Sequence, residues 1–369
     1  ASETQHFSRR ESGSWSDGSV RQLKQPLRTM PLICETHRAR GASILLFRLQ
    51  DFTGDYMSDP EYIVGVDGGG TKTVALLATA DGAVLGIGHA PSSNYQKVGF
   101  AAAAQALEDA EAAAWRAAGL PSQSPAAICL GLSGVDRAED AQMWLRWLAA
   151  TRPQSRHAVI NDAELALAAG TADGWGVGVI SGTGSTVVGR NQAGRFARAD
   201  GWGHILGDDG SGFALGQGAM RAVMRAYDGR GPATMLTEGV LAHWSLPNPE
   251  ALITVVYIEI ASPSRVASLA PVVNHAAEAG DEVALEIVRG AGSELACTIG
   301  AVVHALEIEG AVPCALAGGV LTGSRLVVGF LRDAAQAAGL KIAPVTLVQR
   351  PADGALRIAQ RLLAKAATA

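Results

Sequence analysis

The chain carries the same local pattern twice, and this internal repeat limits the possible folds more than any other feature. The pattern is an apolar strand, a turn of small residues, a second strand, a polar turn and a third strand. The first copy predicts strands over 62–66, 74–80 and 83–88, and the second over 176–180, 186–190 and 195–199. Internal repeats indicate architecture, so we expect two similar halves. The alternative is a chance likeness of two glycine-rich hairpins.

Both turns have the composition of a phosphate-binding loop. The first reads D-G-G-G-T-K-T from Asp67 to Thr73, and the second reads S-G-T-G-S from Ser181 to Ser185. Glycines let backbone N–H groups approach a phosphate, because no Cβ intervenes. Hydroxyls and Lys72 can add donors, and Asp67 can hold a hydrated Mg²⁺. The spacing of a P-loop is absent. The two turns are therefore predicted to grip the two ends of one polyphosphate.

Helices and strands are predicted to alternate between and after the two repeats. Helices are expected over 100–118, 138–150, 163–169, 211–227 and 281–306, and further strands over 126–132, 157–160 and 313–316. This alternation indicates a mostly parallel sheet with flanking helices in each half. The cleft between the halves is the expected ligand site.

Composition and charge narrow the function classes. The 369 residues allow two domains of ordinary size, and the net charge of −5 argues against a nucleic-acid partner. No apolar run approaches the roughly 18 residues that a membrane span needs. The four cysteines, Cys34, Cys129, Cys297 and Cys314, are scattered without a C-x-x-C pair. This spacing suits neither a zinc site nor a disulfide framework, and it indicates a reducing cytoplasm.

Residues 1–56 differ from the remainder of the chain. They hold eight Lys and Arg against six Asp and Glu, with little Ala and no periodic apolar pattern. We interpret them as a disordered extension, or as sequence upstream of a natural start at Met57. A poorly packed N-terminal arm is the alternative. The predicted domains are then 57–173 and 174–369, and the last helix is a candidate for packing back on the first domain.

Six motifs occur in an order that resembles one family. They are D-G-G-G-T-K-T, S-S-N, N-D-A, S-G-T-G-S, G-W-G-H-x-L-G-D-D-G-S-G and A-G-G-V. The series resembles the BadF/BadG/BcrA/BcrD-type ATPase family, most closely its N-acetylglucosamine kinase branch, within the actin, sugar kinase and Hsp70 ATPase superfamily. The resemblance implies an α/β fold with two similar ribonuclease H-like (actin-type ATPase) domains around a central cleft.

The resemblance also assigns ATP and Mg²⁺ to residues from both halves. In the first half the cofactor-binding residues would be Asp67, Gly69, Gly70, Thr71, Lys72 and Thr73, with Asp67 holding Mg²⁺ through water. In the second half they would be Thr183, Gly184, Ser185, Ala267, Gly318 and Gly319, the last three beside adenosine.

Asp162 is the predicted catalytic residue. It follows the strand over 157–160, where the next helix begins, and that end of a strand faces the crevice of an open α/β sheet. Phosphoryl transfer to a sugar needs a carboxylate that accepts the hydroxyl proton and aims the oxygen. The resemblance supports this role and also places Asp162 at the sugar. The alternative is that Asp162 only caps the helix.

The sugar site is predicted from three further segments. Asn94 in S-S-N offers one acceptor and two donors. Gly201, Trp202 and Gly203 follow the second repeat, where Trp202 is expected either to wall the sugar or to lie in the core. The resemblance assigns Asp208 to a sugar hydroxyl, and one of Asp208 and Asp209 is expected to cap the following helix.

The function that the resemblance implies is ATP-dependent phosphorylation of N-acetylglucosamine or glucosamine at O6, by a cytoplasmic homodimer. N-acetylmuramic acid and N-acetylmannosamine stay open, because the loops around the sugar C2 substituent cannot be placed. One alternative is an activator ATPase of a dehydratase or reductase, with an iron–sulfur cluster held between subunits by cysteines. The other is a sugar sensor without catalysis, although residues 1–56 show no helix-turn-helix pattern and Asp162 is present.

Overall fold

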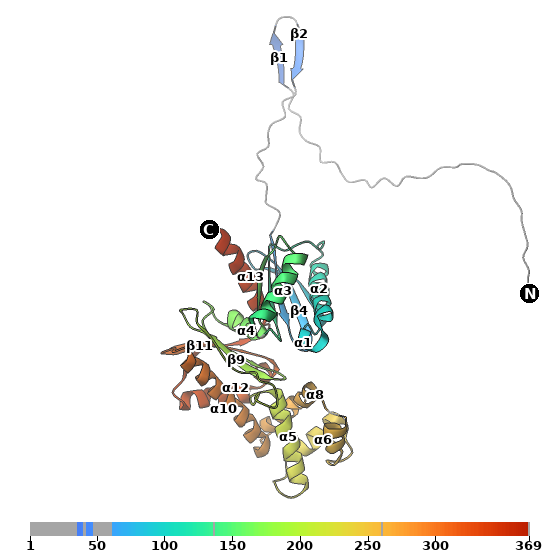
Figure 1. Ribbon diagram of the computed structural model, residues 1–369, viewed down its shortest axis with the longest axis vertical. Helices are drawn as coiled ribbons and strands as arrows, with labels where there is room; N and C mark the ends of the chain where they lie inside the picture. The colour runs from blue at the N-terminus through green and yellow to red at the C-terminus, as the bar shows by residue number, and fades with distance from the viewer. Residues whose placement is uncertain (1–34, 40–41, 47–60, 136, 260, 368–369) are drawn as a thin grey trace, which may run out of the picture. The chain divides into compact units, whose positions relative to one another are not determined.

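The computed structural model describes residues 35–39, 42–46, 61–135, 137–259 and 261–367 (Figure 1). The chain forms two compact units, 1–57 and 58–369. In the first unit, β1 (Glu35–Ala39) pairs antiparallel with β2 (Ala42–Leu46), a hairpin that the sequence did not predict. The other residues that were predicted to be a disordered extension, and the predicted start at Met57, lie outside the described residues.

The second unit begins with a five-stranded sheet in the order β5-β4-β3-β6-β7. Strands β3 (Tyr62–Gly68), β4 (Lys72–Thr79) and β5 (Val84–Pro91) are antiparallel, and β6 (Ala127–Leu132) and β7 (Arg156–Asn161) run parallel to β3. Apolar residues occupy both faces. Val64 and Leu77 pack toward α2 (Phe100–Ala117) and α3 (Ala138–Thr151), whereas Ile63 and Leu76 pack on the opposite side.

A second sheet repeats this topology in the order β10-β9-β8-β11-β12. Strands β8 (Gly176–Ser181), β9 (Ser185–Arg190) and β10 (Phe196–Asp200) are antiparallel, and β11 (Ala311–Ala317) and β12 (Lys341–Val348) run parallel to β8. Helices α10 (Glu282–Ala305) and α12 (Arg325–Ala337) cover one face through a core that includes Val177, Val187 and Leu316. The predicted fold class, two similar α/β halves, is confirmed.

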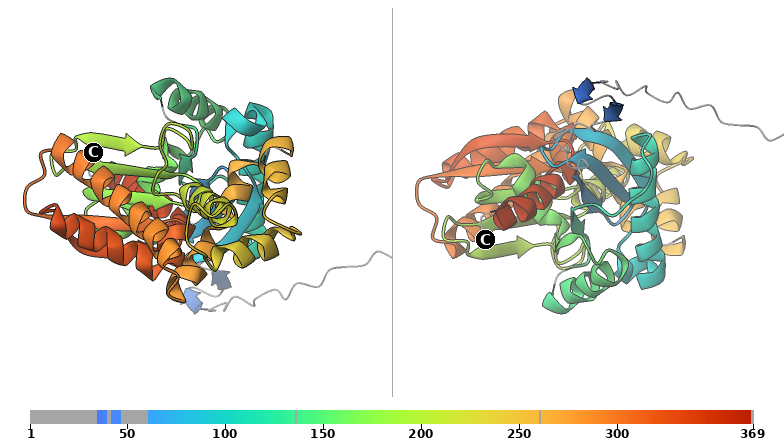
Figure 2. Two further views of the ribbon diagram at one scale, coloured as in Figure 1. Left: turned by 90° about the horizontal axis from the view of Figure 1, so that it is seen from below. Right: turned by 90° about the horizontal axis from the view of Figure 1, so that it is seen from above.

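Two helices connect the halves. α4 (Asp162–Gly170) follows the first sheet but contacts β8 and β11 of the second. α13 (Ala352–Ala367) follows the second sheet but packs on β3 and β6, where Leu356 joins the core around Ile63. α4 and α13 also contact each other, and Figure 2 shows the red C-terminal helix between the blue-to-cyan and the green-to-orange elements.

Further helices extend from the second half, at the lower end of Figure 1. They are α5 (Gly212–Tyr227), α6 (Leu236–Trp244), α7 (Ala251–Ile253), the π-helical turn η1 (Thr254–Ile258), α8 (Pro263–Ala267) and α9 (Ala270–Glu278). Only α5 was predicted from the sequence. Two short helices, α1 (Tyr95–Val98) and α11 (Gly319–Gly323), follow β5 and β11. Among the helices of the described residues, none is both long and apolar enough to cross a membrane.

Candidate active site

A cleft of about 630 Å³ lies between the two sheets, and both halves contribute to its lining. Ten of its lining residues were predicted from the sequence: Gly70, Thr71, Asn94, Asp162, Thr183, Gly184, Ser185, Gly201, Gly203 and Asp208. The two small-residue turns and the predicted base, which are far apart in the chain, therefore meet in one cavity.

The first turn presents Gly70 and Thr71 to the cleft. The Gly69 N–H donates to the Lys72 carbonyl at 2.9 Å, which closes the turn between β3 and β4. A Cβ added to Gly70 would lie 3.1 Å from the Lys97 ammonium, so this cation from α1 lies directly over the turn. Lys97 was not predicted from the sequence, although it follows Asn94 by less than one helical turn.

Thr73, by contrast, points into the protein. Its hydroxyl is buried, donates to the Pro91 carbonyl at 2.7 Å and shares a second hydrogen bond of 2.9 Å with Ser93 Oγ, whose proton is free to donate there. The side chain thus ties β4 to the segment after β5 and is not directed at the cleft. Lys72 is exposed at the start of β4, and neither it nor Gly69 lines the cleft. A phosphate role for these residues stays a prediction.

Asp67 ends the core strand β3 behind the first turn. Burial, together with the nearby Asp162 carboxylate, raises the pKa of Asp67 to about 7, and Lys72 opposes the shift. The Asp67 carboxylate thus lies near a second carboxylate, that of Asp162, although Asp67 itself does not line the cleft. Mg²⁺ suits such a place, because it is commonly held by one or two carboxylates with water and substrate phosphates. No cluster of three His, Cys, Asp or Glu side chains among the described residues could hold a metal.

Asp162 is the first residue of α4 and lines the cleft. The cap of this helix is Asn161, whose Oδ1 accepts the Ala163 N–H at 2.9 Å. The alternative that Asp162 is only the cap is therefore wrong. The positive end of the α4 dipole favours the ionised carboxylate, which is the form that a proton acceptor needs.

The second turn opposes the first across the cleft. The Gly182 N–H donates to the Gly184 carbonyl at 2.9 Å, and Ser185 Oγ donates to Asp200 Oδ2 at 2.9 Å. A Cβ on Gly184 would lie 2.6 Å from Asp208 Oδ2. Glycine is therefore required here by close packing against a carboxylate.

Asp208 lies against this second turn. Burial raises its pKa, the Asp200 carboxylate adds to the rise, and hydrogen bonds from the Ser185 and Gly203 N–H groups oppose it. The backbone N–H of Asp208 donates to Asp200 Oδ1 at 2.9 Å. The expectation that Asp208 or Asp209 caps the next helix is wrong, because Ser211 caps α5 by accepting the Ala214 N–H.

Asn94 is buried at the edge of the cleft. Its Oδ1 accepts the Gln96 N–H at 3.0 Å and caps α1, while its Nδ2 donates to Ser133 Oγ at 3.2 Å. One lone pair of Oδ1 and one proton of Nδ2 are outside these two bonds. The side chain is thereby held in a fixed orientation with capacity for a ligand hydroxyl.

Trp202 is exposed, and its expected role as a wall of the sugar site stays a prediction. Its side chain is 69% exposed, and the Arg198 guanidinium lies 5.9 Å from the ring centroid. The core alternative is wrong, and the ring is not part of the cleft lining, whereas its neighbours Gly201 and Gly203 are. Arg198 itself lines the cleft, as does His204, and neither was predicted as a site residue.

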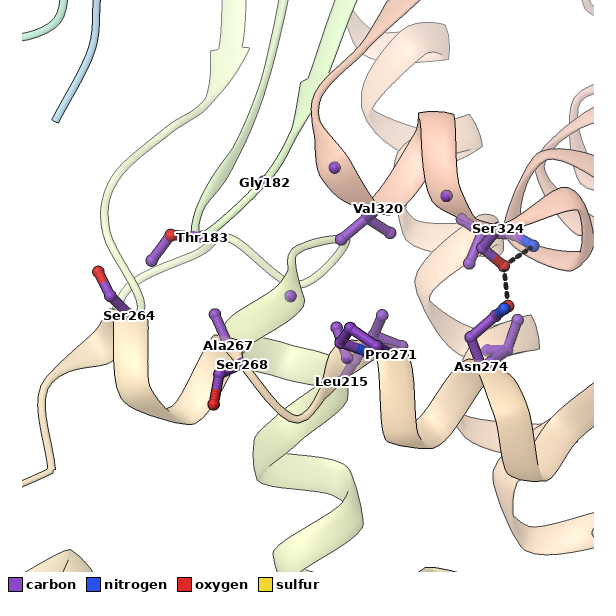
Figure 3. A pocket seen from close by; sticks show the side chains of 16 residues that line it. Gly182, Thr183, Leu215, Ser264, Ala267, Ser268, Pro271, Asn274, Val320 and Ser324 are labelled. Carbon is purple, nitrogen blue, oxygen red and sulfur yellow. Dashed lines mark hydrogen bonds between the residues drawn. The ribbon is translucent and has the colours of Figure 1, made fainter. Parts of the chain in front are cut away.

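A second cavity of about 450 Å³ adjoins the cleft and is shown in Figure 3. Ala267 and Gly319, both predicted beside adenosine, line it. Gly182, Thr183 and Ser264 line both cavities, so the second turn lies where the two spaces meet. Gly318 has a φ of +94°, and a Cβ there would lie 2.2 Å from the Ser181 carbonyl oxygen. It sets the path of the backbone and does not line the cavity.

The two spaces meet at the second turn. The smaller cavity, lined mostly by apolar residues and glycines, leads past Gly182 and Thr183 to the cleft that holds the Asp162 carboxylate. Two repeated sheets with paired glycine turns around such a cleft define the class of two-lobed, actin-like α/β proteins. The chain belongs to the BadF/BadG/BcrA/BcrD ATPase family, whose sequence profile matches residues 64–359.

Three relatives illustrate the likeness. An N-acetylmuramic acid/N-acetylglucosamine kinase from Clostridium acetobutylicum is 34% identical over 81% of this chain and 98% of its own length. An N-acetyl-D-glucosamine kinase from Dictyostelium discoideum is 34% identical over 68% of this chain and 81% of its own. A crystal structure of a candidate N-acetylglucosamine kinase from Chromobacterium violaceum superposes with a TM-score of 0.65 at 32% identity, covering 80% of this chain and 98% of that one.

Proposed function

We propose that this protein is an ATP-dependent kinase of an amino sugar, with N-acetylglucosamine as the first candidate, glucosamine as the second and O6 as the acceptor. The observation that carries the proposal is the position of Asp162, in a cleft with the two glycine turns. The two curated relatives described above are named as amino sugar kinases and share about a third of their residues with this chain.

Each part of the cleft has a role in this reaction. Asp162 accepts the proton of the attacking sugar hydroxyl and aims its oxygen at the γ-phosphorus. The backbone donors of the turns at Gly70 and Gly184 hold the phosphates from two sides. Asn94 and Asp208 hold neighbouring sugar hydroxyls, and Gly201 and Gly203 let the chain pass close to the sugar. Closure of the halves excludes water, which would otherwise accept the phosphoryl group.

Asp67 is the proposed Mg²⁺ anchor, acting through a bound water. Its buried carboxylate and the neighbouring Asp162 provide the excess negative charge that a divalent cation relieves. When bound, Mg²⁺ screens the charge of the polyphosphate and of the transferring group. Asp67 positions the Mg²⁺ ion and does not itself exchange a proton with the sugar.

The division into domains 57–173 and 174–369, the homodimer and the cytoplasmic location belong to this proposal. The division into domains is supported by the two sheets, which repeat one topology on either side of that boundary. The cytoplasmic location is supported by the described cysteines Cys129, Cys297 and Cys314, which are all free. Size measurement of the purified protein with and without ligands would test the dimer.

The activator alternative is not favoured. Cys129 and Cys314 are buried in central strands, and burial raises the pKa of both thiols, that of Cys314 to about 12. Neither is placed to donate a thiolate to a cluster between subunits. Cys34 lies outside the described residues. The sensor alternative is also not favoured, because Asp162 lines the cleft with both glycine turns.

The experiment that tests the function is a panel of amino sugars, each incubated with ATP and Mg²⁺. The panel comprises N-acetylglucosamine, glucosamine, N-acetylmuramic acid and N-acetylmannosamine, with glucose as the sugar without nitrogen. ADP release measures turnover, and phosphorus NMR of the product assigns the phosphorylated oxygen. Sugar-dependent ADP release with a 6-phosphate product is expected. Sugar binding without turnover would favour the sensor, and ADP release that no sugar stimulates would count against a kinase.

A further inference from the structure

The end of the smaller cavity farthest from the second turn carries a chain of directed hydrogen bonds (Figure 3). The Val327 N–H donates to Ser324 Oγ at 3.2 Å, and the Ser324 hydroxyl donates to Asn274 Oδ1. Asn274 Nδ2 in turn donates to Glu278 Oε1 at 3.0 Å. Asn274 and Ser324 both line the cavity. These hydrogen bonds therefore connect α9 with α12 at the far end of the cavity, where the base of a bound nucleotide would end.

Both ends of this chain fix the direction of the Asn274 amide. Ser324 caps α12, so its oxygen accepts a backbone N–H and its proton is left to donate. At the other end, Glu278 Oε1 accepts from Asn274 Nδ2, and a carboxylate oxygen offers lone pairs to a donor. Turning the amide over would place Oδ1 against the Glu278 carboxylate and would leave the Ser324 proton facing an NH₂ group. Asn274 consequently offers its carbonyl oxygen, with a lone pair to spare, at the lining of the cavity.

We propose that Asn274 selects the base of the nucleotide, and that it favours adenine over bases with a 6-oxo group. This inference rests on the proposed use of ATP. The 6-amino group of adenine is a donor and can complete the hydrogen bonding of Asn274 Oδ1. The 6-oxo group of hypoxanthine or guanine is an acceptor and faces another acceptor there. Sites built to bond one polar group discriminate strongly against an analogue that lacks it, because a buried group is left unpaired.

The proposal separates a selecting residue from a positioning residue. Asn274 touches the base, whereas Glu278 acts only by holding the amide in one orientation. Glu278 is exposed on the outer side of α9, so its replacement leaves the lining of the cavity and the fold intact. This gives a second variant whose effect on base preference does not depend on altering the cavity itself.

The test compares ATP with inosine triphosphate, which differs from ATP only at the 6-position of the base and the adjacent ring nitrogen. The wild-type protein is expected to use ATP with a kcat/KM roughly tenfold or more above that for inosine triphosphate. In Asn274→Leu, which keeps the volume but removes the acceptor, the ratio is expected to fall to within about threefold. The ratio is taken on one preparation, so loss of folded protein cancels.

Two substitutions of Glu278 form a matched pair of variants. Glu278→Leu frees the amide to turn, and is expected to lower the ratio by improving use of inosine triphosphate. Glu278→Gln keeps an acceptor for Asn274 Nδ2 and is expected to retain the wild-type ratio. Equal use of the two nucleotides by the wild type would overturn the proposal, as would an unchanged ratio in both Asn274→Leu and Glu278→Leu.

Failure of this proposal is distinct from failure of the proposed function. A protein that phosphorylates sugar equally well from both nucleotides remains a kinase, with Asn274 removed from base selection. A protein that uses neither nucleotide, and whose melting temperature neither ATP nor inosine triphosphate raises, would overturn the kinase assignment and the base selection with it.

Discussion

Burial and, next to it, the carboxylate of Asp162 raise the pKa of Asp67, although the two residues belong to different parts of the chain. Asp67 ends the first strand of the repeat and Asp162 begins the helix after the last strand of the same sheet. One carboxylate thus stands behind the polyphosphate turn and the other beside the proposed acceptor. Binding of a cation and a nucleotide would change the repulsion between these two carboxylates.

Replacing the proposed base should separate chemistry from binding. Asp162→Asn keeps the size of the side chain but removes its capacity to accept a proton. We expect turnover to fall by ~10²-fold or more, with ATP and sugar affinities within a few-fold of wild type in calorimetry. Asp109→Asn, on an exposed position of α2, is the control and should keep full activity. Turnover of Asp162→Asn near the wild-type value would remove this residue from its role.

The buried charge of Asp67 should appear in the pH dependence of stability. Its folded pKa, about 7, lies above the ordinary value of 3.8 for an aspartate, so the native state holds this proton more tightly than the unfolded state. The resulting stabilisation is complete below about pH 4 and is lost as the pH rises through 7. In metal-free protein, Asp67→Asn should therefore raise Tm by roughly 5 °C at pH 8 and by much less at pH 4.

Two further experimental outcomes are expected for Asp67. Asp162→Asn removes the neighbouring charge and should lower the pKa of Asp67, so the same pH-dependent loss of stability should shrink. Mg²⁺-dependent activity should be lost in Asp67→Asn even where its Tm is higher. An equal Tm shift at both pH values would show that Asp67 does not titrate in this range.

Side chains added to the glycine turns should lower the affinity for ATP more than the affinity for sugar. A Cβ on Gly184 would meet Asp208 at 2.6 Å, and a Cβ on Gly70 would meet the Lys97 ammonium at 3.1 Å. Neither glycine has a positive φ, so the effect comes from displaced groups and not from backbone strain. Gly70→Val and Gly184→Val should each raise the KM for ATP at least ~10-fold, the scale of one lost charged hydrogen bond.

Gly290→Ala is the matched control, because a Cβ on this exposed position of α10 meets nothing within 4 Å. Its KM values should match those of wild type. Melting temperature, sugar affinity and ATP affinity are measured on all three variants. Parallel loss of both affinities in step with lower Tm would mean that the glycines only shape hairpins, and the phosphate-loop assignment would fail.

Removal of the first unit should leave the enzyme intact. Residues 58–369 form a compact unit of their own, and the first core strand begins at Tyr62. A chain starting at Met57 is expected to match the full chain in Tm and in sugar kinase activity. Insoluble or inactive protein would show that residues 1–56 contribute to the fold.

The sequence identified the parts of the site that depend on local patterns. Asp162 could be found because it directly follows an apolar strand, and Gly70 and Gly184 because each follows a repeated strand. The direction of the Thr73 side chain could not be predicted, because the strand pairing decides which face a side chain takes, and here Thr73 turns toward Pro91 and Ser93. Local composition does not contain that pairing.

Other residues enter the site only through tertiary packing. Lys97 reaches Gly70, and Asn274 reaches Ser324, across long stretches of chain. The exposure of Trp202 was missed for the same reason. The small helices α6, α8 and α9 escaped prediction because each is short, so that packing on α5 and not an extended periodic pattern stabilises them.

The contact between α4 and α13 also defines how the two halves can move. The helices meet so closely that a Cβ on Gly354 would lie 2.1 Å from the Leu165 carbonyl oxygen. Each of them packs on the sheet of the opposite half, so a rotation of one sheet relative to the other would have its axis near this helix pair. Asp162, at the end of α4, would then stay almost still while the arc of motion carried Gly184 toward Gly70. The proposed base would keep its place on α4, and the distance between the two glycine turns would change.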